Sequence, residues 1–172
     1  IILSAYQLFE ARRNGADVVL LIAQLLSQAA LNGLFERAQS LGMGVLVETH
    51  SRLDALRALE AGALMIGVNA RDLATGDVDR HVIDEVIDVV PSGVLAIAES
   101  GVRGPRDVFE YARAGADAVL VGEALMRSDN PEELVAEMVS AGHHPSLLAD
   151  RRMRIREAHR GSDGSWSDTR RE

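Results

Sequence analysis

The chain has 172 residues, a net charge of −8, 47% apolar residues, no cysteine and no lysine, so all 18 of its basic residues are arginine. These absences exclude disulfides, thiol nucleophiles, cysteine metal clusters, Schiff-base lysines and the phosphate-binding lysine of Walker-type loops. The apolar content suffices for a core, whereas the acidic balance argues against nucleic-acid binding. No apolar run approaches the ~18 residues of a membrane span and no signal-peptide pattern opens the chain, so we expect a cytoplasmic protein without membrane partners.

Charge divides the chain into two parts. Residues 1–145 contain 11 arginines and 21 acidic residues, whereas residues 146–172 contain 7 arginines and 5 acidic residues. The second part is rich in arginine, glycine and serine and offers few residues for a core, a composition typical of disorder. We therefore expect one folded domain at 1–145 and a disordered basic tail at 146–172.

The folded part alternates short apolar runs with helical patterns. Runs that are apolar on both faces predict buried parallel strands, and they lie at residues 18–22, 45–47, 64–68, 94–98 and 119–121, with the end of a further strand at 1–3. Capping residues, prolines and glycines delimit the helices between them. These helices are expected at residues 6–13, 52–61, 81–90, 106–114 and 132–141.

One short pattern, a helix stop followed by the start of a strand, occurs three times. It begins at Gly15, Gly62 and Gly115, at intervals of 47 and 53 residues. Each interval holds two strand–helix units of about 25 residues, which is typical of right-handed βαβ units in a parallel sheet. A (β/α)8 barrel contains eight such units in ~250 residues, whereas this chain offers about six. The pattern alone leaves an open doubly wound sheet and an incomplete barrel as alternatives.

Polar residues follow four consecutive strands of the predicted sheet. In parallel α/β folds, ligands bind at the carboxyl ends of the strands. An open sheet needs such residues only near its switch point, so their presence on strand after strand favours a barrel with one shared pocket. The residues are Glu48, Asn69, Arg71, Glu99, Ser100, Gly101, Gly122 and Glu123.

Two of these side chains suit a catalytic or binding role, and each also has a purely structural interpretation. Glu48 directly follows an apolar strand, and burial there is expected to raise its pKa toward the range of general acid–base catalysis; the alternative is a surface glutamate that caps the next helix. Arg71 can bind a carboxylate or phosphate with both guanidinium nitrogens. Its alternative is a loop arginine paired with Asp72 or Asp77.

The glycines at the last two strands predict an anion site. Gly101 follows Glu99 and Ser100 in a turn whose backbone N–H groups can surround an anion, although an ordinary helix start is the alternative. Gly122 precedes a short helix that begins with Glu123, and barrels bind phosphate at such a helix N-terminus.

The remaining candidates are weaker. His50 lies near the same ends, where it either contributes or only fills space. His143 and His144 are expected to be solvent-exposed rather than metal ligands, and Met126 is expected in the core. We expect neither a metal nor a cofactor.

Together these segments resemble the indole-3-glycerol phosphate synthase family, in order and in spacing, over residues 1 to about 145. The matching segments are 6–12 (YQLFEAR), 15–17 (GAD), 45–50 (VLVETH), 66–73 (IGVNARDL), 98–102 (AESGV) and 120–127 (LVGEALMR). The resemblance implies a (β/α)8 barrel, present from the end of strand three through helix eight. It also implies a carboxy-lyase of tryptophan biosynthesis. That enzyme closes a pyrrole ring on 1-(2-carboxyphenylamino)-1-deoxyribulose 5-phosphate, with loss of CO2 and water.

The resemblance assigns a role to each residue at the strand ends. Glu48 and Asn69 would be catalytic, Glu48 in acid–base steps and Asn69 in positioning the reacting region. Arg71, Glu99 and Ser100 would bind the substrate. Gly101, Gly122 and Glu123 would contact its phosphate. The implied partner is a small phosphorylated molecule, and the complete enzyme is expected to be a monomer.

One departure from the family pattern is large. The family's general-acid lysine, a second lysine and a glutamate all belong to strands expected upstream of residue 1. We therefore expect the chain to be the C-terminal three-quarters of such an enzyme and inactive by itself. The alternatives are a non-catalytic remnant that serves as an interaction module, and another phosphate-binding barrel such as an isomerase or epimerase.

Overall fold

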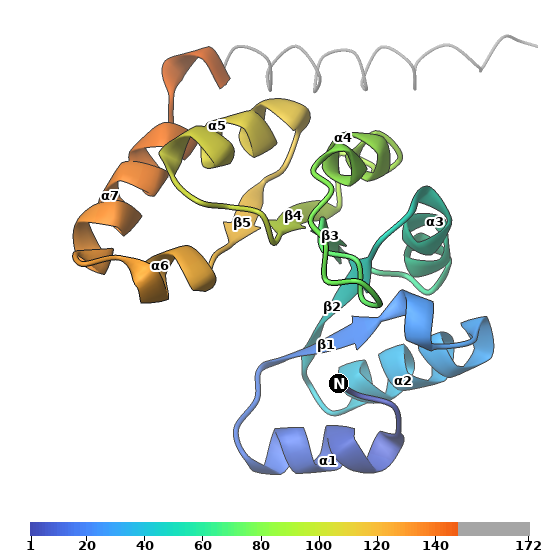
Figure 1. Ribbon diagram of the computed structural model, residues 1–172. Helices are drawn as coiled ribbons and strands as arrows, with labels where there is room; N and C mark the ends of the chain where they lie inside the picture. Colours follow the sequence, from blue (N-terminus) through green and yellow to red (C-terminus); the bar gives the residue numbers. More distant parts are fainter. Residues whose placement is uncertain (148–172) are drawn as a thin grey trace, which may run out of the picture.

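Five parallel strands form one sheet in the computed structural model, which describes residues 1–147 (Figure 1). They are β1 (Val18–Ile22), β2 (Gly44–Thr49), β3 (Met65–Asn69), β4 (Leu95–Glu99) and β5 (Ala118–Leu120). Each strand pairs with the next one along the chain, so the sheet has no switch point at which the order reverses. Strands in chain order form the arc of a barrel, whereas a doubly wound sheet requires a reversal. The structure thus favours the incomplete barrel.

Helices lie along the outside of this row of strands (Figure 1). They are α1 (Ala5–Arg13), the 3-10 helix η1 (Ala23–Leu25), α2 (Gln28–Ser40), α3 (Arg52–Glu60), α4 (His81–Ile87), α5 (Pro105–Ala114), α6 (Glu123–Arg127) and α7 (Pro131–Gly142). None of the helices within residues 1–147 combines the length and the apolarity that a membrane crossing requires. All but the first two residues of the predicted tail lie outside the described residues.

The repeated helix stop is confirmed, and it occurs four times. After α1, α2, α3 and α5 a glycine takes a positive φ, and the next residue donates its N–H to the carbonyl five residues back. At Gly15, for example, φ is 89° and Ala16 N donates to Ala11 O at 3.0 Å. Only glycine adopts this conformation without strain, and the bond satisfies a carbonyl at the helix end. Each following strand begins two or three residues after the glycine.

Three expectations are wrong. Residues 1–3 form no strand, because the Gln7 side chain binds their backbone: its Oε1 accepts from Leu3 N at 2.8 Å and its Nε2 donates to Ile1 O at 3.0 Å. Helix α4 ends at Ile87 rather than at residue 90. Met126 is 87% exposed on α6 and does not belong to the core.

The helices cover one face of the sheet only. On the covered face the strand residues Leu21, Val47, Ile66, Val68 and Ala98 are completely buried. Residues that alternate with them point to the other face, and there Val18, Leu95 and Leu120 are about half exposed (52%, 49% and 56%). The open face is apolar along most of its length and turns polar at the carboxyl ends of β2, β3 and β4.

Candidate active site

Three predicted residues meet at the end of the open face. Glu48, Asn69 and Glu99 end β2, β3 and β4, and the register places Asn69 directly beside Glu99. Asn69 Nδ2 donates to Glu48 Oε1 at 2.9 Å. Both carboxyls are buried, with 6% of Glu48 and 4% of Glu99 exposed. Glu48 is therefore not a surface residue that caps α3; Ser51 and Asp54 cap that helix instead.

Glu99 reaches Glu48 across a glycine. A Cβ on Gly67 of β3 would lie 2.0 Å from Glu99 Oε1, so a side chain at position 67 would displace the carboxyl from its place. Within the described residues, Glu99 Oε1 is buried and has no hydrogen-bond partner. An unpaired buried oxygen is uncommon and costly, which makes it a marker of function. Gly67 was not among the predicted site residues, because nothing in its local sequence shows which side chain crosses it.

The two carboxyls have opposite pKa shifts. Burial, the nearby charge of Glu48 and a hydrogen bond that Glu99 donates to Glu48 raise the pKa of Glu99 to about 7. Burial also acts to raise the pKa of Glu48, but contacts with His50 and Asn69 and the hydrogen bond from Glu99 outweigh it and lower that pKa. The prediction of a raised pKa at Glu48 is thus wrong. Below a pH of about 7, these shifts favour a charged Glu48 beside a Glu99 that carries the proton.

His50 contributes directly to this arrangement. Its Nε2 atom lies 3.2 Å from Glu48 Oε1, and the side chain is 11% exposed. The two atoms are close enough for an ion pair when the imidazole is protonated, and they are not aligned as a hydrogen bond. His50 is therefore more than a space-filling residue near the strand ends.

The turn after β4 is strained and tightly held. Ser100 and Gly101 have φ values of 64° and 72°, and Ser100 is the one non-glycine residue with positive φ within residues 1–147. Tyr111 Oη donates to Ser100 O at 3.3 Å, and Arg80 Nη2 donates to Gly101 O at 2.8 Å. A Cβ on Gly101 would lie 2.8 Å from Tyr111 Oη. Strain of this kind accumulates at functional sites.

Asp107 of α5 fixes Arg80, one of the two residues that hold this turn. It accepts from Arg80 Nη1 at 2.6 Å and from Arg103 Nε at 3.1 Å. Although burial acts to raise it, these arginines hold the pKa of Asp107 below its ordinary value. Sequence reasoning missed Arg80, Asp107 and Tyr111. An acidic residue in the first turn of a helix ordinarily stabilises that helix, so the sequence gives no sign of a second role for Asp107. Its partner Arg80 is 27 residues away in the sequence.

Arg71 connects two loops at the edge of the site. Its Nη1 donates to Gly76 O at 2.7 Å, and its Nη2 lies 3.4 Å from Glu123 Oε2. The alternative pairing with Asp72 or Asp77 is thus not what the structure contains. Arg127 Nη2 lies 3.0 Å from the other Glu123 oxygen, so the Glu123 side chain is occupied by two arginines.

A cleft of about 1230 Å³ brings most of the predicted residues together. Its lining includes Arg71, Glu99, Ser100, Gly101, Gly122 and Glu123, and also Arg80 and Arg103. Glu48 and Asn69 do not line this rim cleft but lie next to it, because Glu48 interacts with the lining residue Glu99 and Asn69 donates to Glu48. Six of the eight predicted residues therefore line one cleft, and the other two adjoin it.

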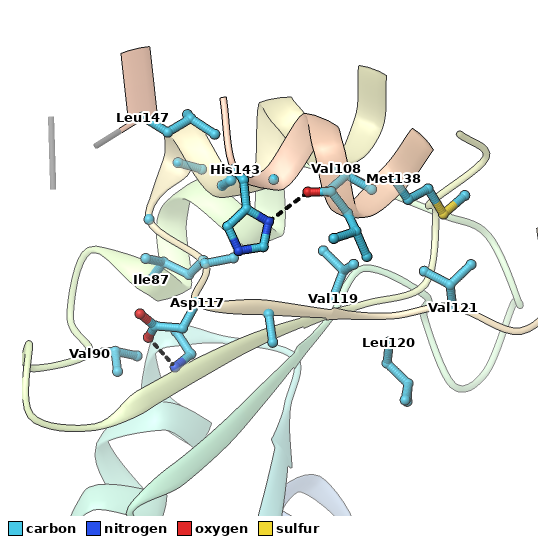
Figure 2. Close-up of a pocket in the computed structure, with 18 of the residues that line it drawn as sticks. Ile87, Val90, Val108, Asp117, Val119, Leu120, Val121, Met138, His143 and Leu147 are labelled. Atoms are coloured by element: carbon cyan, nitrogen blue, oxygen red, sulfur yellow. Dashed lines mark hydrogen bonds between the residues drawn. The ribbon is translucent and has the colours of Figure 1, made fainter. Parts of the chain in front are cut away.

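A second cavity, of about 850 Å³, lies between the covered side of β5 and helices α5 and α7 (Figure 2). Its lining is mainly apolar, with Val108, Val119, Val121 and Met138 facing it. The histidine beside it, His143, is exposed as predicted and bonds through Nδ1 to Val139 O at 2.8 Å. None of the eight predicted residues lines this cavity, so the candidate chemistry lies in the rim cleft.

Known proteins provide an independent comparison. The family model for indole-3-glycerol phosphate synthase matches residues 1–138. An indole-3-glycerol phosphate synthase of Beutenbergia cavernae is 57% identical over 150 residues, which cover 87% of this chain and 56% of that protein. The enzyme of the same name from a Parafrankia species is 56% identical over 145 residues, covering 84% of this chain and 54% of that protein. The chain thus spans about half the length of the curated relatives it matches.

Solved structures support the fold. Thiamine phosphate pyrophosphorylase from Pyrococcus furiosus matches with a TM-score of 0.65 and 18% identity, over 82% of this chain and 65% of that one. The 3-hexulose-6-phosphate synthase of Salmonella typhimurium also has a TM-score of 0.65, at 19% identity, over 81% of this chain and 69% of that one. At these identities the likeness concerns the barrel fold alone. The family match and the identity to the curated relatives go further: this chain belongs to the indole-3-glycerol phosphate synthase family.

Proposed function

We propose that the rim cleft is the substrate site of an indole-3-glycerol phosphate synthase. The reaction converts 1-(2-carboxyphenylamino)-1-deoxyribulose 5-phosphate to indole-3-glycerol phosphate, with loss of CO2 and water. The observation that carries this proposal is the pair of buried carboxyls, Glu48 and Glu99, which end β2 and β4 on either side of Asn69. Closing the ring requires protons to be moved to and from the substrate, and a charged base beside a neutral acid suits that task.

Each side chain of the pair receives a distinct part. Glu48, kept charged, accepts protons, and Asn69, bonded to it, orients the reacting region. Glu99 contacts the substrate as a neutral carboxyl: its one proton is directed to Glu48, so its Oε1 can accept a hydrogen bond from a substrate hydroxyl. Its unpartnered Oε1 supports this assignment, because a substrate group would satisfy it.

Phosphate and carboxylate binding are assigned to the two edges of the cleft. Backbone N–H groups at Gly101, Gly122 and Glu123 contact the phosphate, and Ser100 lines the substrate pocket between them and Glu99. Arg71 binds the substrate carboxylate as a forked donor, with Glu123 as its partner when the site is empty. This arrangement leaves the carboxyl pair free for proton transfer.

The 172 residues lack lysine, and the family's general acid is a lysine. We therefore expect the activity only in a protein that also contains the family's upstream strands. That protein is proposed to be a cytoplasmic monomer, because a small phosphorylated substrate in one barrel mouth requires neither a membrane nor a second subunit.

The test is an assay of indole-3-glycerol phosphate formation. The chain alone is expected to show no turnover, whereas the chain joined to the upstream part of a family member is expected to be active. In the joined protein, Glu48→Gln should lower kcat by about 10²–10⁴-fold and change KM less, because it removes a proton acceptor. The matched control is Glu36→Gln, at an exposed position on α2, with activity unchanged.

Each part of this experiment can fail separately. Substantial turnover by the chain alone overturns the need for the upstream lysine. A joined protein that folds but is inactive overturns the proposed function. Unchanged turnover in Glu48→Gln removes Glu48 from the mechanism.

A further inference from the structure

We propose that His50 is a positioning residue beside the rim cleft: its ring contacts the Glu48 carboxylate, favours its charged form and holds it in place opposite Glu99. The catalytic consequence rests on the proposed function. The charge arrangement itself can be measured without any turnover. None of the roles assigned above includes this histidine.

The geometry places His50 for this task. It directly follows β2, and its backbone N donates to Asp54 Oδ2 at 3.3 Å in the first turn of α3. The main chain therefore anchors the residue between the strand and the helix. From there Nε2 lies 3.2 Å from Glu48 Oε1, the same oxygen that accepts the hydrogen bond from Asn69.

The ring is a poor packing residue where it lies. Both ring nitrogens are buried, and within the described residues neither has an aligned hydrogen bond. An apolar side chain of similar size would fill the same space without leaving polar atoms unsatisfied. Packing therefore does not explain a histidine at this position, whereas the electrostatic contact with Glu48 does.

The charged groups that act on the ring are acidic. Glu48 of β2 contacts it, and Glu99 of β4 and Asp72 of the loop after β3 interact with it electrostatically. Asp54, at the start of α3, accepts from the backbone N of His50 rather than from the ring. Asp54 has its own partner in Arg57, at 3.5 Å. Among the groups that act on Glu48, His50 is the one that can carry a positive charge.

Contact with the imidazole affects the charges of the two carboxyls differently. Two acids that share a buried site cannot both ionise easily, so a small bias decides which one keeps the proton. The imidazole stabilises the negative charge on Glu48 more than on Glu99, because it touches Glu48. Metal binding is not an alternative that the geometry supports, since no group of three His, Asp or Glu residues within residues 1–147 is arranged to hold an ion.

The test is an NMR titration of the 172-residue chain. Glutamate carboxyl carbons are followed against pH and assigned with Glu48→Gln and Glu99→Gln. In His50→Asn, the midpoint of Glu48 should rise by about one pH unit, the shift typical of losing an opposite charge at contact. The difference between the titration midpoints of Glu48 and Glu99 should become smaller. His144→Asn is the control, because His144 is exposed and packs on Phe109, and it should leave both midpoints in place. Unchanged midpoints in His50→Asn overturn the proposal.

A second variant covers the case in which His50→Asn does not fold. His50→Gln keeps a polar side chain that cannot carry a charge, and the Glu48 midpoint should rise in it as well, whereas Glu36→Gln should leave that midpoint in place. A Glu48 midpoint that is the same with and without the imidazole overturns the proposal. An inactive joined protein would refute the proposed function and leave these midpoints unaffected.

Discussion

The two faces of the sheet have the same apolar character but different surroundings. On the covered face, side chains such as Leu21, Val47 and Val68 are completely buried under helices. On the open face, Val18, Leu95 and Leu120 are about half exposed. Apolar strand residues thus contribute to stability only where another element covers them. The polar end of the open face instead holds Glu48 and Glu99, the pair proposed for proton transfer.

The largest expected effect contrasts leucines on the two faces. Leu21→Ala removes a fully buried side chain from the covered face and should lower the free energy of unfolding by about 2–5 kcal/mol. Leu95→Ala, on the open face, should cost less than about 1 kcal/mol because water already reaches half of the side chain. Denaturant unfolding of both variants measures the difference. Equal costs would mean that the open face is covered in solution.

A second prediction concerns the dependence of stability on pH. The pKa of Glu99 rises from the ordinary 4.5 to about 7 in the folded chain. A carboxyl whose pKa is raised on folding stabilises the folded state. Its full contribution to the free energy of unfolding is present below pH 4.5 and is lost as the pH rises through about 7. The loss is about 3 kcal/mol. Glu99→Gln, which stays neutral, should remove this slope between pH 4.5 and 7, as followed by denaturant unfolding across that range. A slope that persists in Glu99→Gln would assign it to another group.

The smallest expected effect contrasts two glycines. Gly101→Ala should destabilise the chain by about 1–3 kcal/mol, because φ is 72° and the new Cβ would meet Tyr111 Oη and Val78 Cγ1. Gly33→Ala, within α2 and with open space around it, should instead stabilise the chain by about 0.5–1 kcal/mol. Thermal unfolding of both variants shows which one is destabilised and which one is stabilised. A harmless Gly101→Ala would show that the turn after β4 is not held as described.

Features that depend on local chemistry could be predicted from the sequence. The helix stops at Gly15, Gly62 and Gly115 follow from the conformational freedom of glycine, and they set the positions of the strands. The polar residues at successive strand ends lie together because parallel strands end at one edge. Residues 1–3 form no strand, because an apolar run needs a neighbouring strand to pair with. The Gln7 side chain forms hydrogen bonds with their backbone instead.

Features that depend on distant side chains could not be predicted in this way. The direction of the pKa shift at Glu48 requires knowing that His50, Asn69 and Glu99 all reach it, from three different segments. Arg71 and Glu123 are 52 residues apart and meet only because β3 and β5 end at the same edge. The need for glycine at position 67 becomes visible only when the Glu99 side chain is placed across it.

The two buried carboxyls at the strand ends titrate at different pH values, so that Glu99 holds its proton up to a pH of about 7 beside a charged Glu48. The most direct test is a carbon NMR titration of Glu99 in the wild-type chain, with the signal assigned by its absence in Glu99→Gln. We expect a midpoint near 7 for Glu99, above that of Glu48. A Glu99 midpoint at the ordinary carboxyl value of 4.5 would contradict it.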